Sequence, residues 1–193
     1  MNLSVATIED IEATLKLHYQ YQVDQIKDED KADGFVTTAF TSEQLKALIE
    51  REQGLFIAST GEGQNKTVHG YVMAASWEFW SQWPMFAYMI QELPKLRYLQ
   101  QTLSTSNSYQ YGPVCIHKDH RGSGLLPSLF EFSRQHMALR FPILITFINK
   151  QNPRSFAAHT QKLNLEVIDE FQFNGNDYYE LAYDTSRPLI SVE

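Results

Sequence analysis

An apolar run, ILITFI at positions 143–148, in which Thr146 is the one polar residue, is the feature that most constrains the fold. Such a run, without polar alternation, is typical of a strand that is buried on both faces. Patterns of amphipathic helices flank it, because apolar residues recur every three or four positions in 125–140 and NPRSFAAHTQKL follows at 152–163. A strand covered on both faces needs helices on both sides of its sheet. We therefore predict a layered, mixed α/β fold.

Hydrophobic periodicity and turn residues predict the other elements. We expect strands at 3–8, 55–60, 67–77, 109–118, 143–148, 166–174 and 177–183, and helices at 9–24, 42–53, 125–140 and 152–163. The polar segment 24–33 is predicted to be a loop, and the aromatic-rich segment 78–107 an insert with two short helices. The pair Gly112-Pro113 interrupts the fourth strand and predicts a bulge or a splay there.

Length and composition indicate one compact domain, residues 1–193, because 43% of the chain is hydrophobic and 20% is charged. No apolar run approaches the ~18 residues of a membrane span, and the first ten residues do not resemble a secretory signal, so a cytoplasmic protein is expected. The single cysteine, Cys115, can form no internal disulfide. His117 and His120 have no evident third ligand, so no metal site is predicted.

Charge is distributed unevenly along the chain. The net charge of −7 argues against nonspecific binding to nucleic acid. Residues 117–162, however, contain seven basic and two acidic side chains, a net charge of +5, whereas the remainder has a net charge of −12. The basic segment is either a solvated helix face or a site for an anion.

An anion site is favoured by the loop after the fourth strand. The strand residues Val114-Cys115-Ile116 are followed by a loop that ends in Arg121-Gly122-Ser123-Gly124, where a helix begins. Glycines at a helix start let an anion approach backbone amides at the positive end of the helix dipole, and an arginine adds a charged hydrogen bond. The spacing is not that of a P-loop, a dinucleotide fingerprint or a nucleophile elbow, which argues against Ser123 as a nucleophile. A plain strand-to-helix turn is the alternative.

The segments PVCIHKDHRGSGLLPSLFEF (113–132) and INKQNPRSFAAHTQKLNLEVI (148–168) both contain spaced motifs. They resemble two segments of the GNAT superfamily of acyl-CoA N-acyltransferases. Arg121 and Gly124 fit the family's Arg/Gln-x-x-Gly-x-Gly/Ala loop, which binds pyrophosphate, whereas Leu126 departs from its last position. Asn152 and His159 hold the spacing of the family's Asn-containing segment, in a form with His in place of Tyr.

This resemblance implies the GNAT fold, a mixed α/β domain of α+β type. Its central sheet is mostly antiparallel, is splayed between the fourth and fifth strands, and has helices on both faces. The resemblance also implies acetyl-CoA as co-substrate, with no metal. The phosphates of acetyl-CoA would be the anionic ligand of the basic segment 117–162. The residues implied in coenzyme binding are Val114, Cys115, Ile116, Arg121, Gly122, Ser123, Gly124, Leu125, Leu126, Asn152 and Ser155.

The same resemblance gives His159 the place of the acid that protonates the departing CoA thiolate. The base that removes the amine proton is not identified, because Phe147 stands where some relatives have a glutamate. Glu78, expected at a strand end, is one candidate. Tyr109 or Tyr111, acting through a water, are the others, and each of the three has a structural role as its alternative.

The sequence thus predicts an N-acetyltransferase that transfers an acetyl group to a primary amine by direct attack in a ternary complex. The acceptor is a small molecule or a peptide. A non-catalytic module that senses acyl-CoA is the alternative, favoured by Phe147 and Leu126. The insert is expected either to roof an acceptor pocket, where aromatic faces attract a cationic amine, or to form a local core or a homodimer contact.

Overall fold

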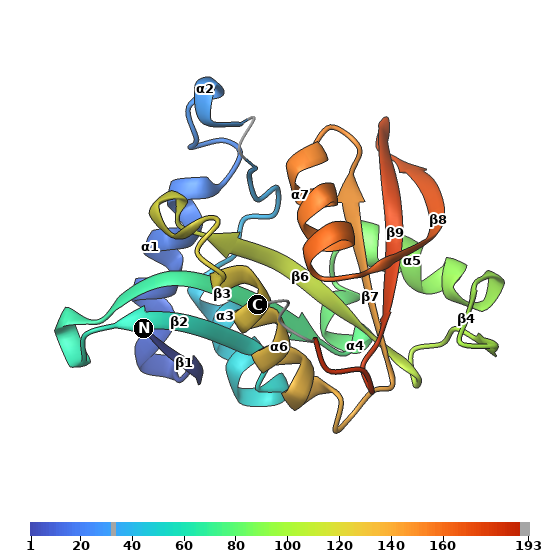
Figure 1. Cartoon of the computed structure of the whole chain (residues 1–193), viewed down its shortest axis with the longest axis horizontal. Coiled ribbons are helices and arrows are strands. Elements are labelled where there is room, and N and C mark those ends of the chain that lie inside the picture. The colour runs from blue at the N-terminus through green and yellow to red at the C-terminus, as the bar shows by residue number, and fades with distance from the viewer. Residues whose placement is uncertain (32–33, 190–193) are drawn as a thin grey trace. The chain divides into compact units, whose positions relative to one another are not determined.

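The computed structural model describes residues 1–31 and 34–189 (Figure 1). Seven strands are ordered β1-β2-β3-β6-β7-β9-β8. Strands β6 and β7 are parallel, whereas the pairs β1–β2, β2–β3, β7–β9 and β8–β9 are antiparallel. The predicted fold class, a mixed α/β fold around a mostly antiparallel sheet, is confirmed.

The bounds of the elements are as follows. The strands of the sheet are β1 (Asn2–Val5), β2 (Leu55–Thr60), β3 (Thr67–Ala75), β6 (Ser108–Ile116), β7 (Ile143–Asn149), β8 (Glu166–Phe173) and β9 (Asn176–Asp184). The helices are α1 (Ile11–Tyr21), α2 (Asp28–Lys31), α3 (Ser42–Ala47), α4 (Trp77–Trp80), α5 (Pro84–Glu92), α6 (Leu125–Met137) and α7 (Pro153–Ala157).

The chain divides into two compact units. Unit 1 consists of Met1–Ala74 and Gly112–Ser133, and unit 2 of Ala75–Tyr111 and Arg134–Glu193. The single domain expected from the length stays a prediction.

Unit 1 has helices on both faces of its strands. His18 of α1 lies against Tyr71 of β3, with 2.8 Å between the imidazole Nδ1 and the phenol oxygen. Tyr71 pairs with Ile57 of β2, and the next residue back, Phe56, contacts Phe132 of α6 with ring centroids 6.0 Å apart. Because neighbouring strand residues point to opposite faces, α1 and α6 cover opposite faces of these strands.

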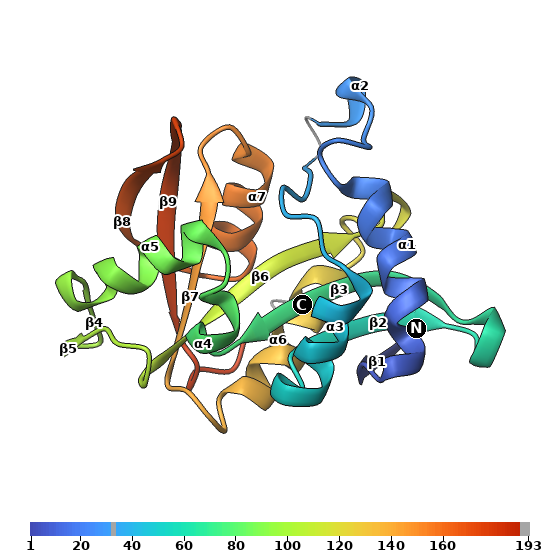
Figure 2. The same cartoon turned by 180° about the vertical axis from the view of Figure 1, so that it is seen from behind.

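Unit 2 repeats this arrangement around β7 and β9. Phe147 of β7 contacts Phe86 of α5, with ring centroids 5.6 Å apart. The following residue, Ile148, pairs with Tyr179 of β9, which lies 4.3 Å from Phe156 of α7. Helix α7 therefore covers the face of these strands seen in Figure 1, and α5 covers the face seen in Figure 2.

Several predicted boundaries are wrong. The strand expected at 67–77 ends at Ala75, and Trp77 begins α4 instead, because its buried indole donates to Ser108 Oγ at 3.0 Å. The segment 24–33, predicted to be a loop, contains the short helix α2, with an ion pair between Lys31 and Asp28, while residues 32–33 lie outside the described residues.

The insert contains the two expected short helices, α4 and α5. It also contains a two-stranded hairpin, β4 (Arg97–Tyr98) and β5 (Gln101–Thr102), that was not predicted. In the part of the chain that the structure describes, no helix is long and apolar enough to span a membrane.

Candidate functional site

The loop before α6 has the backbone that the sequence predicts. Gly122 and Gly124 have φ angles of +80° and +83°, in the left-handed region that favours glycine. A Cβ atom built on either residue would meet no atom within 4 Å, so the space beside this backbone is open. The first amides of α6 have no carbonyl partner within the helix and carry the positive end of its dipole. The loop therefore offers an anion both open space and hydrogen-bond donors.

Arg121 is held against this loop by two contacts in unit 1. Its Nε donates to the Ile116 carbonyl at 3.1 Å, and its guanidinium lies 5.0 Å from the centre of the Tyr21 ring. The neighbouring Ser123 hydroxyl donates to the His120 carbonyl at 2.6 Å. This bond orders the turn, which fits the view that Ser123 is not a nucleophile.

The strand before the loop alternates in burial. Cys115 is buried, and this burial raises the pKa of its thiol to about 12, which makes it a poor nucleophile at neutral pH. Val114 and Ile116 are half-buried. At the start of α6, Leu125 is buried, whereas Leu126 is half-buried and does not join the core.

The β6–β7 ladder ends just before Gly112-Pro113, the pair at which the sequence predicts a bulge or a splay. The register of β6 on β7 runs from Ser108–Ile143 to Gln110–Ile145, and β7 continues to pair with β9 as far as Asn149. Immediately after the last pair, the Thr146 hydroxyl donates to the Tyr111 carbonyl at 2.6 Å. A side chain thus satisfies the backbone group at the point where the β6–β7 ladder ends.

In unit 2, α7 and the helical turn η6 (Ala158–Lys162) bring three predicted residues together. Asn152 caps α7, because its Oδ1 accepts from the Ser155 amide at 3.1 Å. His159 follows one turn after Ser155 and is only 7% exposed. Its ring centroid lies 6.0 Å from that of Tyr111.

The hydrogen bond of His159 fixes its tautomer. Its Nδ1 lies 2.8 Å from the Ser155 carbonyl oxygen, which can only accept, so Nδ1 carries the proton. Burial lowers the pKa of His159. The imidazole is therefore neutral near pH 7, and its Nε2 is an acceptor. In this state His159 must first take up a proton before it can donate one.

Comparison with known proteins identifies the fold. The sequence matches no family model and no curated protein. Solved structures match over nearly their whole length. A putative acetyltransferase from Salmonella typhimurium, described with its cofactor acetyl-CoA, has a TM-score of 0.61 and 15% identity over 97% of this chain and 95% of that chain. The chain has the GNAT acetyltransferase fold.

Two further acetyltransferase structures also match. An N-acetyltransferase from Staphylococcus aureus has a TM-score of 0.60 and 18% identity, covering 95% of this chain and 98% of that chain. A ribosomal-protein-alanine N-acetyltransferase from Brucella melitensis has a TM-score of 0.56 and 19% identity, covering 95% of this chain and 99% of that chain.

The base candidates of this GNAT fold differ in environment. Glu78 lies in α4 rather than at a strand end, and its side chain is exposed. Tyr109 and Tyr111 are buried, and their burial raises both pKa values further, so neither phenol readily becomes a phenolate.

One buried carboxylate was not among the candidate residues predicted from the sequence. Glu180 of β9 is 2% exposed, and its burial, together with the charges of Asp169 and Glu92, raises its pKa to about 8. The available signal was its place in the alternation Tyr178, Glu180, Ala182, where a glutamate occupies an inward position. Without the register of β9 on its neighbouring strands, the sequence does not show whether the Glu180 side chain is buried or exposed.

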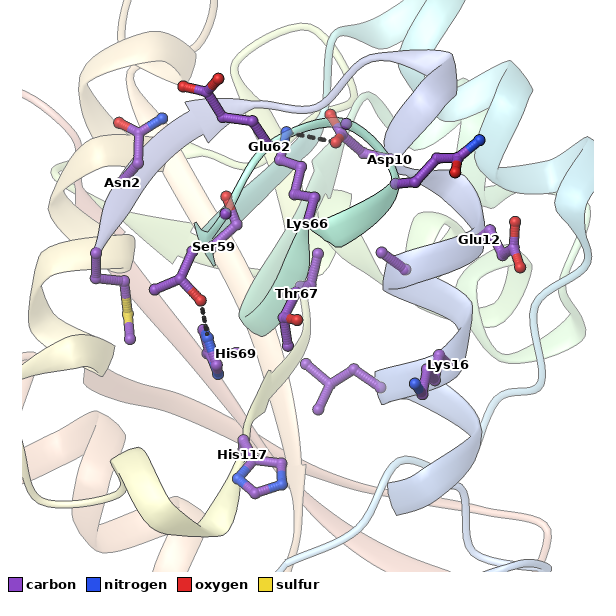
Figure 3. Close-up of a pocket in the computed structure, with 18 of the residues that line it drawn as sticks. Asn2, Asp10, Glu12, Lys16, Ser59, Glu62, Lys66, Thr67, His69 and His117 are labelled. Carbon is purple, nitrogen blue, oxygen red and sulfur yellow. Dashed lines mark hydrogen bonds and ion pairs between the residues drawn. The ribbon is translucent and has the colours of Figure 1, made fainter.

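Unit 1 contains a separate cavity of about 1510 Å³ between α1, the β2–β3 hairpin and the turn at 117–120. Figure 3 shows the ion pair of Lys66 with buried Asp10 at 2.5 Å on its wall. His69 Nδ1 lies 3.1 Å from His120 Nε2. Among residues 1–31 and 34–189, no group of three or more His, Cys, Asp or Glu could hold a metal ion. The residues predicted to bind the coenzyme do not line this cavity.

Proposed function

We propose that this protein is an acetyl-CoA-dependent N-acetyltransferase that acetylates a primary amine by direct attack in a ternary complex. The observation that carries the proposal is the loop Arg121–Gly124. Two glycines with positive φ face open space at the start of α6, with an arginine held beside them, in a chain with the GNAT fold.

The loop suits the phosphates of acetyl-CoA. The pyrophosphate would accept hydrogen bonds from backbone amides at Gly122, Gly124 and the first turn of α6. The positive charge of Arg121 would add to this attraction. Val114 and Ile116, past the end of the β6–β7 ladder, would offer backbone groups to the amides of the pantetheine arm. Acetyl-CoA supplies the thioester that reacts.

His159 would move a proton during the transfer. As the C–N bond forms, Nε2 of the neutral imidazole would accept a proton from the amine nitrogen. The imidazolium would then give this proton to the CoA sulfur as the C–S bond breaks. This order satisfies both the lowered pKa of His159 and the role of acid that the family resemblance implies. The Asn152 cap and the Ser155 carbonyl position the ring.

The acceptor is proposed by chemical class only, a primary amine of a small molecule or a peptide. One neighbouring structure is named as a ribosomal-protein-alanine N-acetyltransferase, so a protein N-terminus belongs to the acceptors worth testing. A cytoplasmic location and a homodimer stay predictions of the sequence.

A non-catalytic acyl-CoA sensor is the second candidate. It is favoured by Leu126, whose half-buried side chain stands at the coenzyme loop where the family pattern has a small residue. A bulky side chain there would narrow the approach of the phosphates to the helix.

Two measurements test the proposal. Thermal unfolding should show a higher Tm with CoA and with desulfo-CoA, because the phosphates anchor both. Free thiol should then appear when acetyl-CoA is mixed with an acceptor from a panel of amines and N-terminal peptides. No Tm shift at millimolar CoA would overturn both candidates. A Tm shift without thiol release on any acceptor would favour the sensor.

A further inference from the structure

Glu180 is the most buried member of a group of aromatic and acidic side chains on the face of unit 2 that α5 covers. Its register partners are Phe147 on β7 and Asp169 on β8. Residues two positions apart on a strand share a face, so Tyr178 belongs to the same group. We call Phe147, Asp169, Phe171, Tyr178 and Glu180, with Tyr88 and Glu92 of α5, the acidic-aromatic cluster.

The rings of this cluster pack against each other. Phe171 and Tyr178 are stacked with centroids 5.2 Å apart, and Phe147 lies 5.7 Å from Tyr178. Tyr88 of α5 lies 5.8 Å from Phe171. Burial decreases outward, because Glu180 is buried, Tyr88, Phe171 and Tyr178 are half-buried, and Asp169 is exposed. Three half-buried rings thus share this face with the buried carboxylate.

The charges of the cluster are unbalanced. Within the described part of the chain, Oε1 of Glu180 is buried and has no hydrogen-bond partner. The charged groups that face it are Asp169 from β8 and Glu92 from α5, both acidic, and Glu92 is already bound to Lys95 at 2.8 Å. Buried carboxylates in proteins are normally paired or protonated. Glu180 is therefore mostly protonated at neutral pH, and a cation beside it would favour its carboxylate form.

We propose that Glu180 binds the ammonium group of the acceptor and is the first base to take its proton. This inference rests on the proposed function and deepens it by naming the substrate class, a primary ammonium cation. Aromatic faces attract such a cation, and the rings of Phe147, the cross-strand partner of Glu180, and Tyr178, two residues before it, share the face of the carboxylate.

Glu180 lies next to the position where this chain lacks the base carboxylate that some relatives have. Phe147 stands where some relatives have a glutamate, and Glu180 is its direct cross-strand partner, so the carboxylate occupies the adjacent strand on the same face. Phe147 is two residues beyond the last β6–β7 pair, Gln110–Ile145, so Glu180 lies beside the end of that ladder. His159 lies in η6, the helical turn that follows α7, and α7 covers the opposite face. The two groups are thus suited to different protons.

Glu180 and His159 together account for every proton that the ammonium group loses in the reaction. The ammonium passes one proton to the Glu180 carboxylate, which later releases it to solvent. The neutral amine attacks the thioester carbonyl, the C–N bond forms, and its second proton goes to Nε2 of His159. The C–S bond breaks, and the thiolate receives that proton. The products are the N-acetyl amide, CoA thiol and one free proton.

Glu180→Gln tests the inference, with Glu170→Gln as the matched control. Glu170 is exposed on β8 and pairs with Tyr179, so its side chain faces away from the cluster. We expect Glu180→Gln to lower kcat/KM by about 10²-fold or more, the scale of a general base, and to remove the rise in kcat/KM as the pH passes about 8. Glu170→Gln should keep both. Equal activity and an equal pH profile in Glu180→Gln would overturn the inference.

A second readout does not depend on turnover. Carbon-13 NMR of the Glu180 carboxyl, titrated with and without butylamine, should show its pKa fall when the cation binds, because a nearby positive charge favours the carboxylate. An unchanged titration would overturn the inference. If the wild type binds CoA but acetylates no amine, the proposed function fails, and this titration still decides whether Glu180 binds ammonium. The CoA-induced Tm shift of Glu180→Gln shows that the variant is folded.

Discussion

The Nδ1 atom of His159 lies 2.8 Å from the carbonyl oxygen of Ser155, one turn earlier in the same helical segment. This contact holds the proton of the neutral imidazole on Nδ1 and leaves Nε2 as an acceptor. The residue that the family resemblance places as an acid is therefore built to accept a proton first. The contribution of His159 to activity should therefore be lost as the pH falls, and not as it rises.

We predict that His159→Ala lowers kcat by about 10²-fold, the low end of acid–base contributions, and raises KM less, because a thiolate is an adequate leaving group. Steady-state kinetics with the acceptor found in the panel check this. His136→Ala, on the exposed side of α6, is the control.

The pH profile separates the two roles of His159. Because burial lowers the pKa of His159 below its ordinary value of 6.5, a proton-accepting His159 is neutral and ready to accept above that pH, and its contribution is lost only as the pH falls below it. A His159 that must begin as imidazolium would instead lose activity as the pH rises. A wild-type kcat that declines from pH 6 upward would contradict the shuttle.

We predict that Gly124→Val abolishes the rise in Tm caused by CoA, because a branched side chain fills the space beside the helix amides. Gly175→Val is a matched control. Gly175 also has a positive φ, +75°, and its Cβ would also meet nothing within 4 Å, but it lies in the β8–β9 turn. Both variants pay a similar backbone cost of about 1–2 kcal/mol. Equal loss of the CoA shift in both would mean that strain alone explains the result.

We predict that Glu180→Gln stabilises the free protein at alkaline pH. Folding raises the pKa of Glu180 from 4.5 to about 8, so its favourable contribution is full below pH 4.5 and is lost as the pH rises to about 8. Each pH unit in this window costs the wild type up to about 1.4 kcal/mol. Urea unfolding at pH 5 and pH 9 should show that the wild type loses a few kcal/mol more than the variant. Parallel losses would show that Glu180 titrates normally.

We predict that kcat/KM for a polyamine falls as ionic strength rises, more steeply than for butylamine. Residues 24–33 have five acidic and two basic side chains, a net charge of −3, and the insert adds Glu78 and Glu92. Residues 32–33 lie outside the described residues. Long-range attraction to these charges is screened over ~10 Å at 0.1 M salt. A flat salt profile for the polyamine would show that these carboxylates are only solvated.

The local features of this protein were readable in its sequence. The buried strand at 143–148 and the loop Arg121–Gly124 both formed as predicted, since each depends on neighbours in the chain or on backbone freedom. The Gly112-Pro113 pair likewise marked the end of the β6–β7 ladder. Trp77 did not follow the local pattern, since it begins α4 and its buried indole donates to Ser108, 31 residues away.

The sequence by itself determined the fold class, the loop backbone at Gly122 and Gly124, and the spacing of Asn152 and His159. Only the tertiary structure decided that Glu180 is buried beside Phe147 and that Nδ1 of His159 holds its proton. A strand's register changes every facing residue when it slips by one position, and nothing local in β9 specifies its partner on β7. Burial shifts the pKa values of Glu180 and His159, and it arises only when segments far apart in the chain pack together.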